Sequence, residues 1–236
     1  MNEVPKSAEL NPGPGFMIRR TVDRLPPEVA EGLAEFESTD ISDVLNRMYA
    51  MRADIRNMVN DAELCGPVCT VKTYPGDNLM VHKVLDIARP GDIVVIDASG
   101  SMSAAVIGDM ISNKARHRGI AGFIVDGLVR DLAGLQECGM PIYARGITPF
   151  GPLHRGPGEV NYAVCCGGIV VHPGDIVRAD SSGIAVIPRD AAESTLQRLR
   201  QNHERLSRYV ADVKRGEFSN GWVDAQLARD MCIIHD

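Results

Sequence analysis

The sequence has no apolar run long enough to cross a bilayer, and its first residues, MNEVPKSAELNPGPG, lack the charged and then apolar layout of a secretion signal. We therefore expect a cytoplasmic protein. Basic residues are not in excess either: 25 Lys and Arg stand against 31 Asp and Glu, a formal net charge of -6. This balance disfavours a nucleic-acid or membrane surface built on electrostatic attraction, so a small molecule is the expected partner.

Sulfur and histidine motifs are also missing. The six cysteines include no CxxC pair, and the six histidines show no paired spacing typical of a zinc site. We interpret the cysteines as small buried residues, with Cys232 near a mobile end of the chain, because a chain of this size builds a core without disulfides. No glycine-rich loop has the nucleotide-binding layout, which argues against a methyltransferase.

What is present divides into three expected regions: an arm and short helix over residues 1–35, a core over 36–195, and a helix with a tail over 196–236 that we expect to contact another subunit. In the segment STDISDVLNRMYAM, an N-terminal cap at Ser38 or Thr39 and one apolar face ending at Met48 predict a helix. Asp43 lies off that face, near the expected helix start.

Strand and helix patterns alternate between residues 66 and 148. Strands are expected at 66–74, 92–99, 119–125 and 141–148, and helices at 78–88, 108–118 and 129–139. After Thr148, short apolar runs between glycines predict hairpins of a second sheet. The prediction is an α/β fold with two sheet layers and helices on one side, whose ligand sites lie beyond the carboxyl ends of strands.

Two turns after strands carry charge: GDMISNKA, with Asp109, and DGLVRD, with Arg130 and Asp131. Twenty residues separate Asp109 from Arg130, enough for a helix, a turn and a strand, so both are expected at one sheet edge. Within DGLVRD we expect Asp126 and Gly127 to shape the turn. Each charged residue alone has a structural alternative as a helix cap or surface ion pair, and only their convergence favours a site.

The chemistry that fits these residues is a hard divalent cation beside an anionic substrate. Mg²⁺ accepts one or two carboxylates and keeps several waters, which suits Asp131 and Asp109. Arg130 offers a fork for a carboxylate. The amides at the start of the second predicted helix offer a further anion cradle, at Gly108, Asp109, Met110 and Ile111.

The Asp-x20-Arg-Asp spacing, together with PGDNLMVH, RPGDIVVID and CGGIVVHPGDIVRADSSGIAVIP, resembles the class II pyruvate aldolases that cleave 4-hydroxy-4-methyl-2-oxoglutarate and 4-carboxy-4-hydroxy-2-oxoadipate. That family shares its fold with the regulator of ribonuclease activity A. The resemblance covers roughly residues 36 to 195. It implies a layered β/β/α sandwich of the swivelling-domain type with flanking helices, and homotrimers or homohexamers.

The resemblance also implies roles. Asp131 matches the direct ligand of Mg²⁺ or Mn²⁺, Asp109 a carboxylate that holds the metal through water, and Arg130 the group that binds the pyruvyl carboxylate beside the amides from Gly108 to Ile111. Asp43 falls where the family has a glutamate near the metal waters. Asn78, in PGDN, is a substrate-side neighbour.

The implied reaction is retro-aldol cleavage of a 4-hydroxy-2-oxo acid to pyruvate, with oxaloacetate decarboxylation as a second activity. One departure concerns a glutamate that the family brings from an adjacent subunit: Leu206 stands there, and Glu204 is the nearest carboxylate. Two alternatives stay open. A Schiff-base aldolase needs a buried lysine, with Lys72, Lys83 and Lys114 as candidates. A non-catalytic regulator that binds ribonuclease E shares the fold.

Overall fold

The computed structural model describes residues 9–235, except for the side chains of residues 204–206. It contains two compact units, one extending to Leu196 and the other beginning at Gln197. Within the described part of the chain, no helix is both long and apolar enough to span a membrane.

The first unit is built on a mixed sheet with four parallel central strands. Along the sheet the order is β1 (Phe16–Ile18), β8 (Gly158–Val160), β3 (Leu64–Thr73), β4 (Ile93–Asp97), β6 (Gly122–Val129), β7 (Ile142–Ile147) and β2 (Arg56–Asn57). The predicted alternation is confirmed here, since β3, β4, β6 and β7 run parallel. A short strand absent from the sequence prediction, β5 (Ala105–Ile107), pairs with the last residues of β6.

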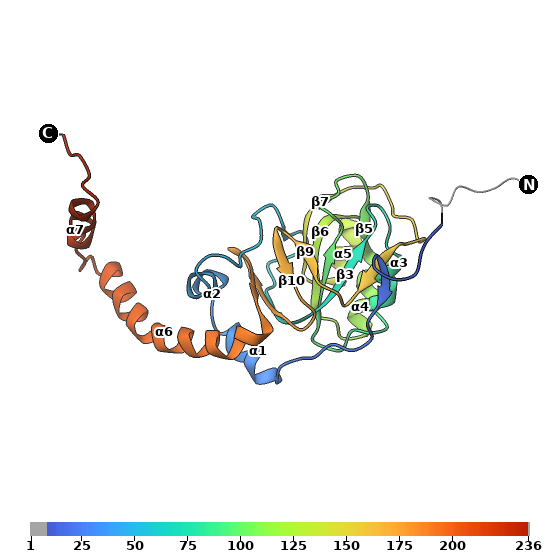
Figure 1. The fold of residues 1–236 in the computed structure, drawn as a ribbon, viewed down its shortest axis with the longest axis horizontal. Coiled ribbons are helices and arrows are strands. Elements are labelled where there is room, and N and C mark those ends of the chain that lie inside the picture. Colours follow the sequence, from blue (N-terminus) through green and yellow to red (C-terminus); the bar gives the residue numbers. More distant parts are fainter. Residues whose placement is uncertain (1–8, 236) are drawn as a thin grey trace, which may run out of the picture. The chain divides into compact units, whose positions relative to one another are not determined.

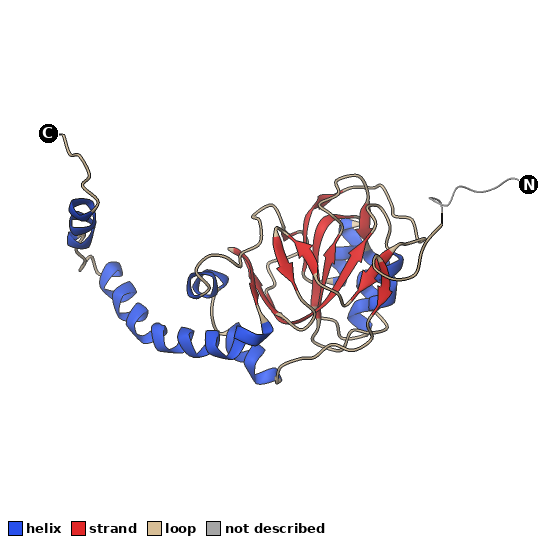
Figure 2. Cartoon of the chain, in the orientation of Figure 1, coloured by secondary structure: helices blue, strands red, loops and turns tan. Residues whose placement is uncertain are grey.

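Each face of this sheet is covered by a different layer. On β4, Val94 and Ile96 join the core cluster with the helices, whereas Ile93 and Val95 join the cluster with the second strand layer. The helices are α3 (Leu79–Val84), α4 (Asp109–His117) and α5 (Leu132–Cys138), and the second layer holds β9 (Val164–Cys166), β10 (Ile169–Val171), β11 (Ile176–Asp180) and β12 (Gly183–Ile187). The alternation of side chains along a strand therefore produces the β/β/α layering, with strands and helices on opposite sides of the central sheet (Figures 1 and 2).

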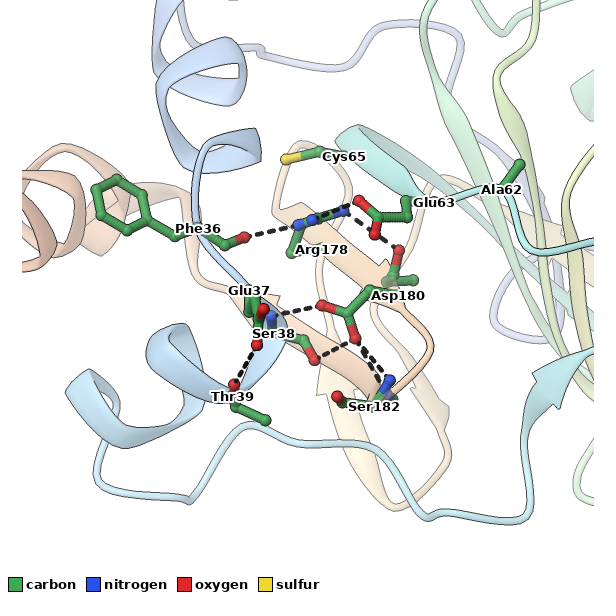
Figure 3. A network of polar contacts seen from close by, with 12 residues as sticks. Phe36, Glu37, Ser38, Thr39, Ala62, Glu63, Cys65, Arg178, Asp180 and Ser182 are labelled. Atoms are coloured by element: carbon green, nitrogen blue, oxygen red, sulfur yellow. Dashed lines mark hydrogen bonds and ion pairs between the residues drawn. The ribbon is translucent and has the colours of Figure 1, made fainter. Parts of the chain in front are cut away.

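Two helices of the N-terminal part, α1 (Pro27–Ala34) and α2 (Ser38–Val44), lie against the second layer and β3. A polar network fixes the start of α2 (Figure 3). Asp180 on β11 accepts bonds from the Ser38 amide and hydroxyl, both 2.7 Å long. On the same strand, Arg178 donates to the Phe36 carbonyl at 2.8 Å and pairs with Glu63 at 2.6 Å.

The second helix is shorter than predicted. It ends at Val44, and Asn46 and Arg47 follow with φ of 57° and 62°. Two successive left-handed residues cannot continue a right-handed helix, so Met48 lies outside it and is 72% exposed. Ser38 is also not a side-chain cap, because its hydroxyl bonds Asp180. Asp43 is consequently near the end of α2 rather than near its start.

The chain beyond the second layer forms a 3₁₀ turn (Arg189–Ala191), the long helix α6 (Ala192–Lys214) and α7 (Gly221–Arg229). Helix α6 contains the boundary between the two units. Glu204 and Leu206, where the sequence departs from the aldolase pattern, fall on side chains outside the described residues. Their role, and the expected inter-subunit role of this region, remain predictions.

Candidate active site

The carboxyl ends of β5 and β6 place two predicted site segments side by side. The two strands are parallel, and the Arg130 amide donates to the Ile107 carbonyl at 3.0 Å, which extends their ladder by one bond. Gly108 follows β5 and leads into α4, while Asp131 follows Arg130 and leads into α5. The convergence expected from the 20-residue spacing is therefore a property of neighbouring parallel strands.

Asp131 has a left-handed backbone, which is uncommon outside glycine. It occupies the N-cap of α5 with φ 61° and ψ 46°, yet its side chain makes no cap bond to that helix. Its carboxylate lies against Gly108 instead, in space that a β-carbon on residue 108 would need, and Arg130 Nε approaches Oδ2 at 3.2 Å. A left-handed backbone at a non-glycine residue costs about 1 to 2 kcal/mol of folding free energy. The carboxylate of Asp131 does not offset this cost by capping α5, which would be its simplest structural role.

Asp109 begins α4 and lies against the first turn of α5. A β-carbon on Gly134 would be 2.7 Å from the Asp109 β-carbon, so the two helices approach closely there. Asp109 Oδ1 accepts the Met110 amide at 2.6 Å. One of the four amides in the predicted anion cradle is thus already engaged by a carboxylate.

Nearly all the predicted site residues line one cavity of about 190 Å³. Arg130 and Asp131 remain 41% and 42% exposed, which leaves both accessible to a ligand. The predicted residues that line the cavity are Asn78, Gly108, Asp109, Met110, Ile111, Arg130 and Asp131.

Asp43 does not line this cavity. It lies on α2, which packs on β11 and β12, and its side chain is 64% exposed and pairs with Arg47 at 3.0 Å. Within one chain the structure therefore does not bring Asp43 to the other predicted residues, and its role stays a prediction.

Two histidines that sequence reasoning left aside line the same cavity. His154 Nδ1 lies 2.5 Å from Asn78 Oδ1, and the His82 ring meets the His154 ring edge-on, with centroids 5.5 Å apart. His82 follows Asn78 by one helical turn, a spacing visible in the sequence. His154 had no such signal, because it reaches Asn78 across 76 positions. Burial, aided by the charges of Lys114 and His154, lowers the pKa of His82.

The first half of DGLVRD differs from its prediction. Strand β6 continues to Val129, and a bulge falls between Val125 and Leu128 where β6 faces β7. Asp126 is a buried strand residue that pairs with Arg145 and accepts the Gly167 amide at 2.8 Å. It ties the central sheet to the β9–β10 hairpin, so the predicted turn at Asp126 and Gly127 was wrong.

A larger hollow, of about 610 Å³, lies elsewhere between the N-terminal segment and the second layer. Among its charged side chains, Arg189 pairs with Asp23 at 3.5 Å and with Asp190 at 3.4 Å. Because no carboxylate there is held in a strained conformation, we place the candidate active site in the smaller cavity.

Comparison with known proteins decides the family. The sequence model of the RraA-like group, described as Aldolase/RraA, matches residues 38–186. The chain belongs to the RraA-like family. A Halalkalibacterium halodurans protein named "Putative 4-hydroxy-4-methyl-2-oxoglutarate aldolase" is 36% identical over 178 residues, which covers 74% of this chain and 85% of that protein.

Solved structures with a similar fold carry different names. The RNA-processing inhibitor RraA from Thermus thermophilis is 31% identical, with a TM-score of 0.61 over 65% of this chain and 93% of that one. A Geobacillus kaustophilus protein, described as S-adenosylmethionine:2-dimethylmenaquinone methyltransferase, is 29% identical, with a TM-score of 0.61 over 66% of this chain and 96% of that one. Family membership alone therefore does not select one activity.

Proposed function

We propose that this RraA-like protein is a divalent-cation-dependent aldolase that cleaves 4-hydroxy-2-oxo acids to pyruvate and also decarboxylates oxaloacetate. The observation that carries the proposal is Asp131, a carboxylate held in a strained backbone, free of its own helix and directed at the cavity's charged end. Its likeness to a protein named as an aldolase supports the same activity.

The residues present fit Mg²⁺ or Mn²⁺. Asp131 and Asp109 offer hard oxygen ligands from two helix starts that line one cavity. Among the described residues no group of three or more His, Cys, Asp or Glu has the arrangement of a metal cage. A sparse pair of carboxylates suits a cation that keeps several water ligands, so Asp131 would hold it directly and Asp109 through water.

The chain's own residues then bind and orient the substrate. Arg130 donates to the carboxylate next to the 2-keto group, in a fork geometry that also fixes the direction of the C3–C4 bond. The amides at the start of α4 that remain open add positive potential on the same side. When bound, the cation supplies a Lewis acid for the negative charge that develops at the 2-keto oxygen.

Lysine chemistry has less support. Lys72 and Lys114 are exposed, and Lys83 pairs with Asp86 at 3.2 Å. None of the three lines the cavity. A Schiff base needs a desolvated amine beside the substrate, so we place the reaction in the cation-dependent class.

The proposal is tested by pyruvate release from 4-hydroxy-2-oxo acids with Mg²⁺ or Mn²⁺. EDTA should abolish the activity, added Mg²⁺ should restore it, and borohydride with substrate should leave no adduct by mass spectrometry. Activity that survives EDTA and leaves a trapped lysine adduct would overturn the cation-dependent class.

A regulatory role is the second candidate function, supported by the likeness to the RNA-processing inhibitor RraA from Thermus thermophilis. This regulatory role would replace the aldolase proposal under two conditions. The purified protein with Mg²⁺ would release neither pyruvate from 4-hydroxy-2-oxo acids nor carbon dioxide from oxaloacetate, and it would bind ribonuclease E in a pull-down of the two purified proteins.

A further inference from the structure

The amide of Asn78 has only one possible orientation. Asn78 is 2% exposed, and its Nδ2 donates to the Val106 carbonyl at 2.9 Å. A carbonyl oxygen only accepts hydrogen bonds, so the atom that faces Val106 must be the amide nitrogen. Oδ1 therefore faces His154, at 2.5 Å from Nδ1.

This orientation sets the tautomer of His154. An amide oxygen is an acceptor, so His154 Nδ1 must carry the hydrogen of the contact. In the neutral ring, Nε2 then holds a lone pair and accepts protons. His154 lines the cavity that also contains Asp109, Arg130 and Asp131, so this acceptor belongs to the candidate active site.

The segment that carries His154 is held in place on both sides. The backbone amide of Asn78 donates to the Leu153 carbonyl at 3.0 Å, and the backbone amide of Leu153 donates to the Gly76 carbonyl at 2.7 Å. Beyond the histidine, the Arg155 amide donates to Asp77 Oδ2 at 2.6 Å. These three bonds join the segment to the turn before α3, so the imidazole is positioned before a ligand arrives.

Charged groups of both signs surround the ring in the cavity. His82 meets it edge-on from α3, and the positive charges of Lys114 on α4 and Arg130 after β6 lie on neighbouring elements. Arg155 follows it in the same loop, and the negative groups are Asp77 before α3 and the cavity carboxylates Asp109 and Asp131.

We propose that His154, fixed in the Nδ1–H tautomer by Asn78, accepts the proton of the substrate's 4-hydroxyl in the cleavage reaction. The proposal rests on the proposed aldolase function and names its base. As the proton moves to Nε2, the O–H electron pair forms the new C4 carbonyl, and the C3–C4 bond breaks with its pair left on C3 as pyruvate enolate. The exposed imidazolium releases its proton to water, and C3 takes a proton from water.

The other cavity groups are less suited to this step. Arg130 has no acceptor atom, and Asp109 and Asp131 are assigned to the cation. His82 is half-buried, and its ring packs against His154 in a T-shaped arrangement, which leaves His154 as the more exposed ring. Asn78 is a positioning residue, since it acts only through the imidazole.

Two substrates separate this step from simple binding. A 4-hydroxy-2-oxo acid must lose a hydroxyl proton, whereas oxaloacetate forms the same enolate by losing carbon dioxide and has no such proton. In His154→Gln, kcat for cleavage should fall about 100-fold or more, the range of general base catalysis, while kcat for oxaloacetate changes only about threefold. His117→Gln, at the far end of α4, is the matched control and should leave both rates unchanged. An equal fall of both rates, or no fall in cleavage, would overturn the proposal.

The tautomer gives a test that does not depend on turnover. In ¹⁵N-labelled protein, the imidazole correlations of His154 should show the Nδ1–H form, and Asn78→Leu should shift His154 toward Nε2–H and lower kcat for cleavage more than for decarboxylation. An Nε2–H ring in the unmodified protein would overturn the assignment. If the unmodified protein turns over neither substrate, the aldolase function itself fails and the proton transfer fails with it, whatever the tautomer.

Discussion

The carboxylate of Asp131 lies in the space that a β-carbon on Gly108 would fill. Gly108 has φ of -150°, an extended backbone that any residue adopts, so its lack of a side chain matters for this contact and not for its conformation. The close approach joins the start of α4 to the start of α5, and it is the relationship on which the candidate site depends.

Gly108→Ala should displace Asp131 and the adjacent Arg130 without straining the backbone. We expect the affinity for Mn²⁺ to fall about 10- to 100-fold, as for other changes beside a metal ligand, when it is measured by isothermal titration calorimetry. Gly221→Ala is the control, because a β-carbon there meets only Ser219 Oγ at 3.4 Å. Unchanged affinity in Gly108→Ala would contradict the assignment of Asp131.

The left-handed backbone of Asp131 predicts a difference between two variants. Glycine adopts φ of 61° readily and alanine does not, so Asp131→Gly should be more stable than Asp131→Ala by about 1 kcal/mol. Urea unfolding of the two proteins measures this difference directly. Both variants should lose cation binding, and equal stabilities would show that residue 131 is not strained.

The buried pair of Arg145 and Asp126 supports the end of β6 before the site begins. Their side chains are 10% and 8% exposed, so Arg145→Met should leave a buried carboxylate without its partner and cost about 3 to 5 kcal/mol. Lys83→Met removes an exposed partner of Asp86 and should cost less than about 1 kcal/mol. Denaturant unfolding measures the stability of both variants. Similar losses of unfolding free energy in the two would argue against a structural role for the buried pair.

The contact of Ser38 with Asp180 predicts a pH dependence. Burial opposes ionisation of Asp180, but hydrogen bonds from Ser38 and Ser182 and the charge of Arg178 outweigh it and lower its pKa below the ordinary 3.8. A lowered carboxyl pKa stabilises the fold above pH 3.8, and that contribution is lost as the pH falls through the still lower folded value.

Asp180→Asn should therefore be clearly less stable than the unmodified protein at pH 7. This difference in stability should become smaller below about pH 4. Ser38→Ala should cost about 1 to 2 kcal/mol at pH 7, whereas the exposed Thr39→Ala should cost little. Thermal unfolding across pH measures both effects. If the stability difference between Asp180→Asn and the unmodified protein becomes larger in acid, the pKa of Asp180 is not lowered by folding.

The parts of the site that were predictable follow from chain order. Parallel strands joined by helices must deliver their carboxyl ends to one edge, so the spacing from Asp109 to Arg130 was enough to bring them together. The end of α2 was not predicted: Asn46 tolerates a left-handed backbone, but Arg47, which shares it, has no such preference. The buried position of Asp126 involves an ion pair with Arg145 in the next strand, and the orientation of His154 depends on Asn78 in a distant turn. Contacts between distant segments decided these features, and local patterns do not encode them.

The decisive experiment is a coupled assay of pyruvate release from 4-hydroxy-4-methyl-2-oxoglutarate with Mg²⁺, run on the unmodified protein and on Asp131→Ala. If Asp131 holds the cation, the unmodified protein should release pyruvate in a metal-dependent way, and the variant should lose nearly all activity while retaining its fold. Equal rates for the two proteins, or no release by the unmodified protein from this and related 4-hydroxy-2-oxo acids, would contradict the proposed function.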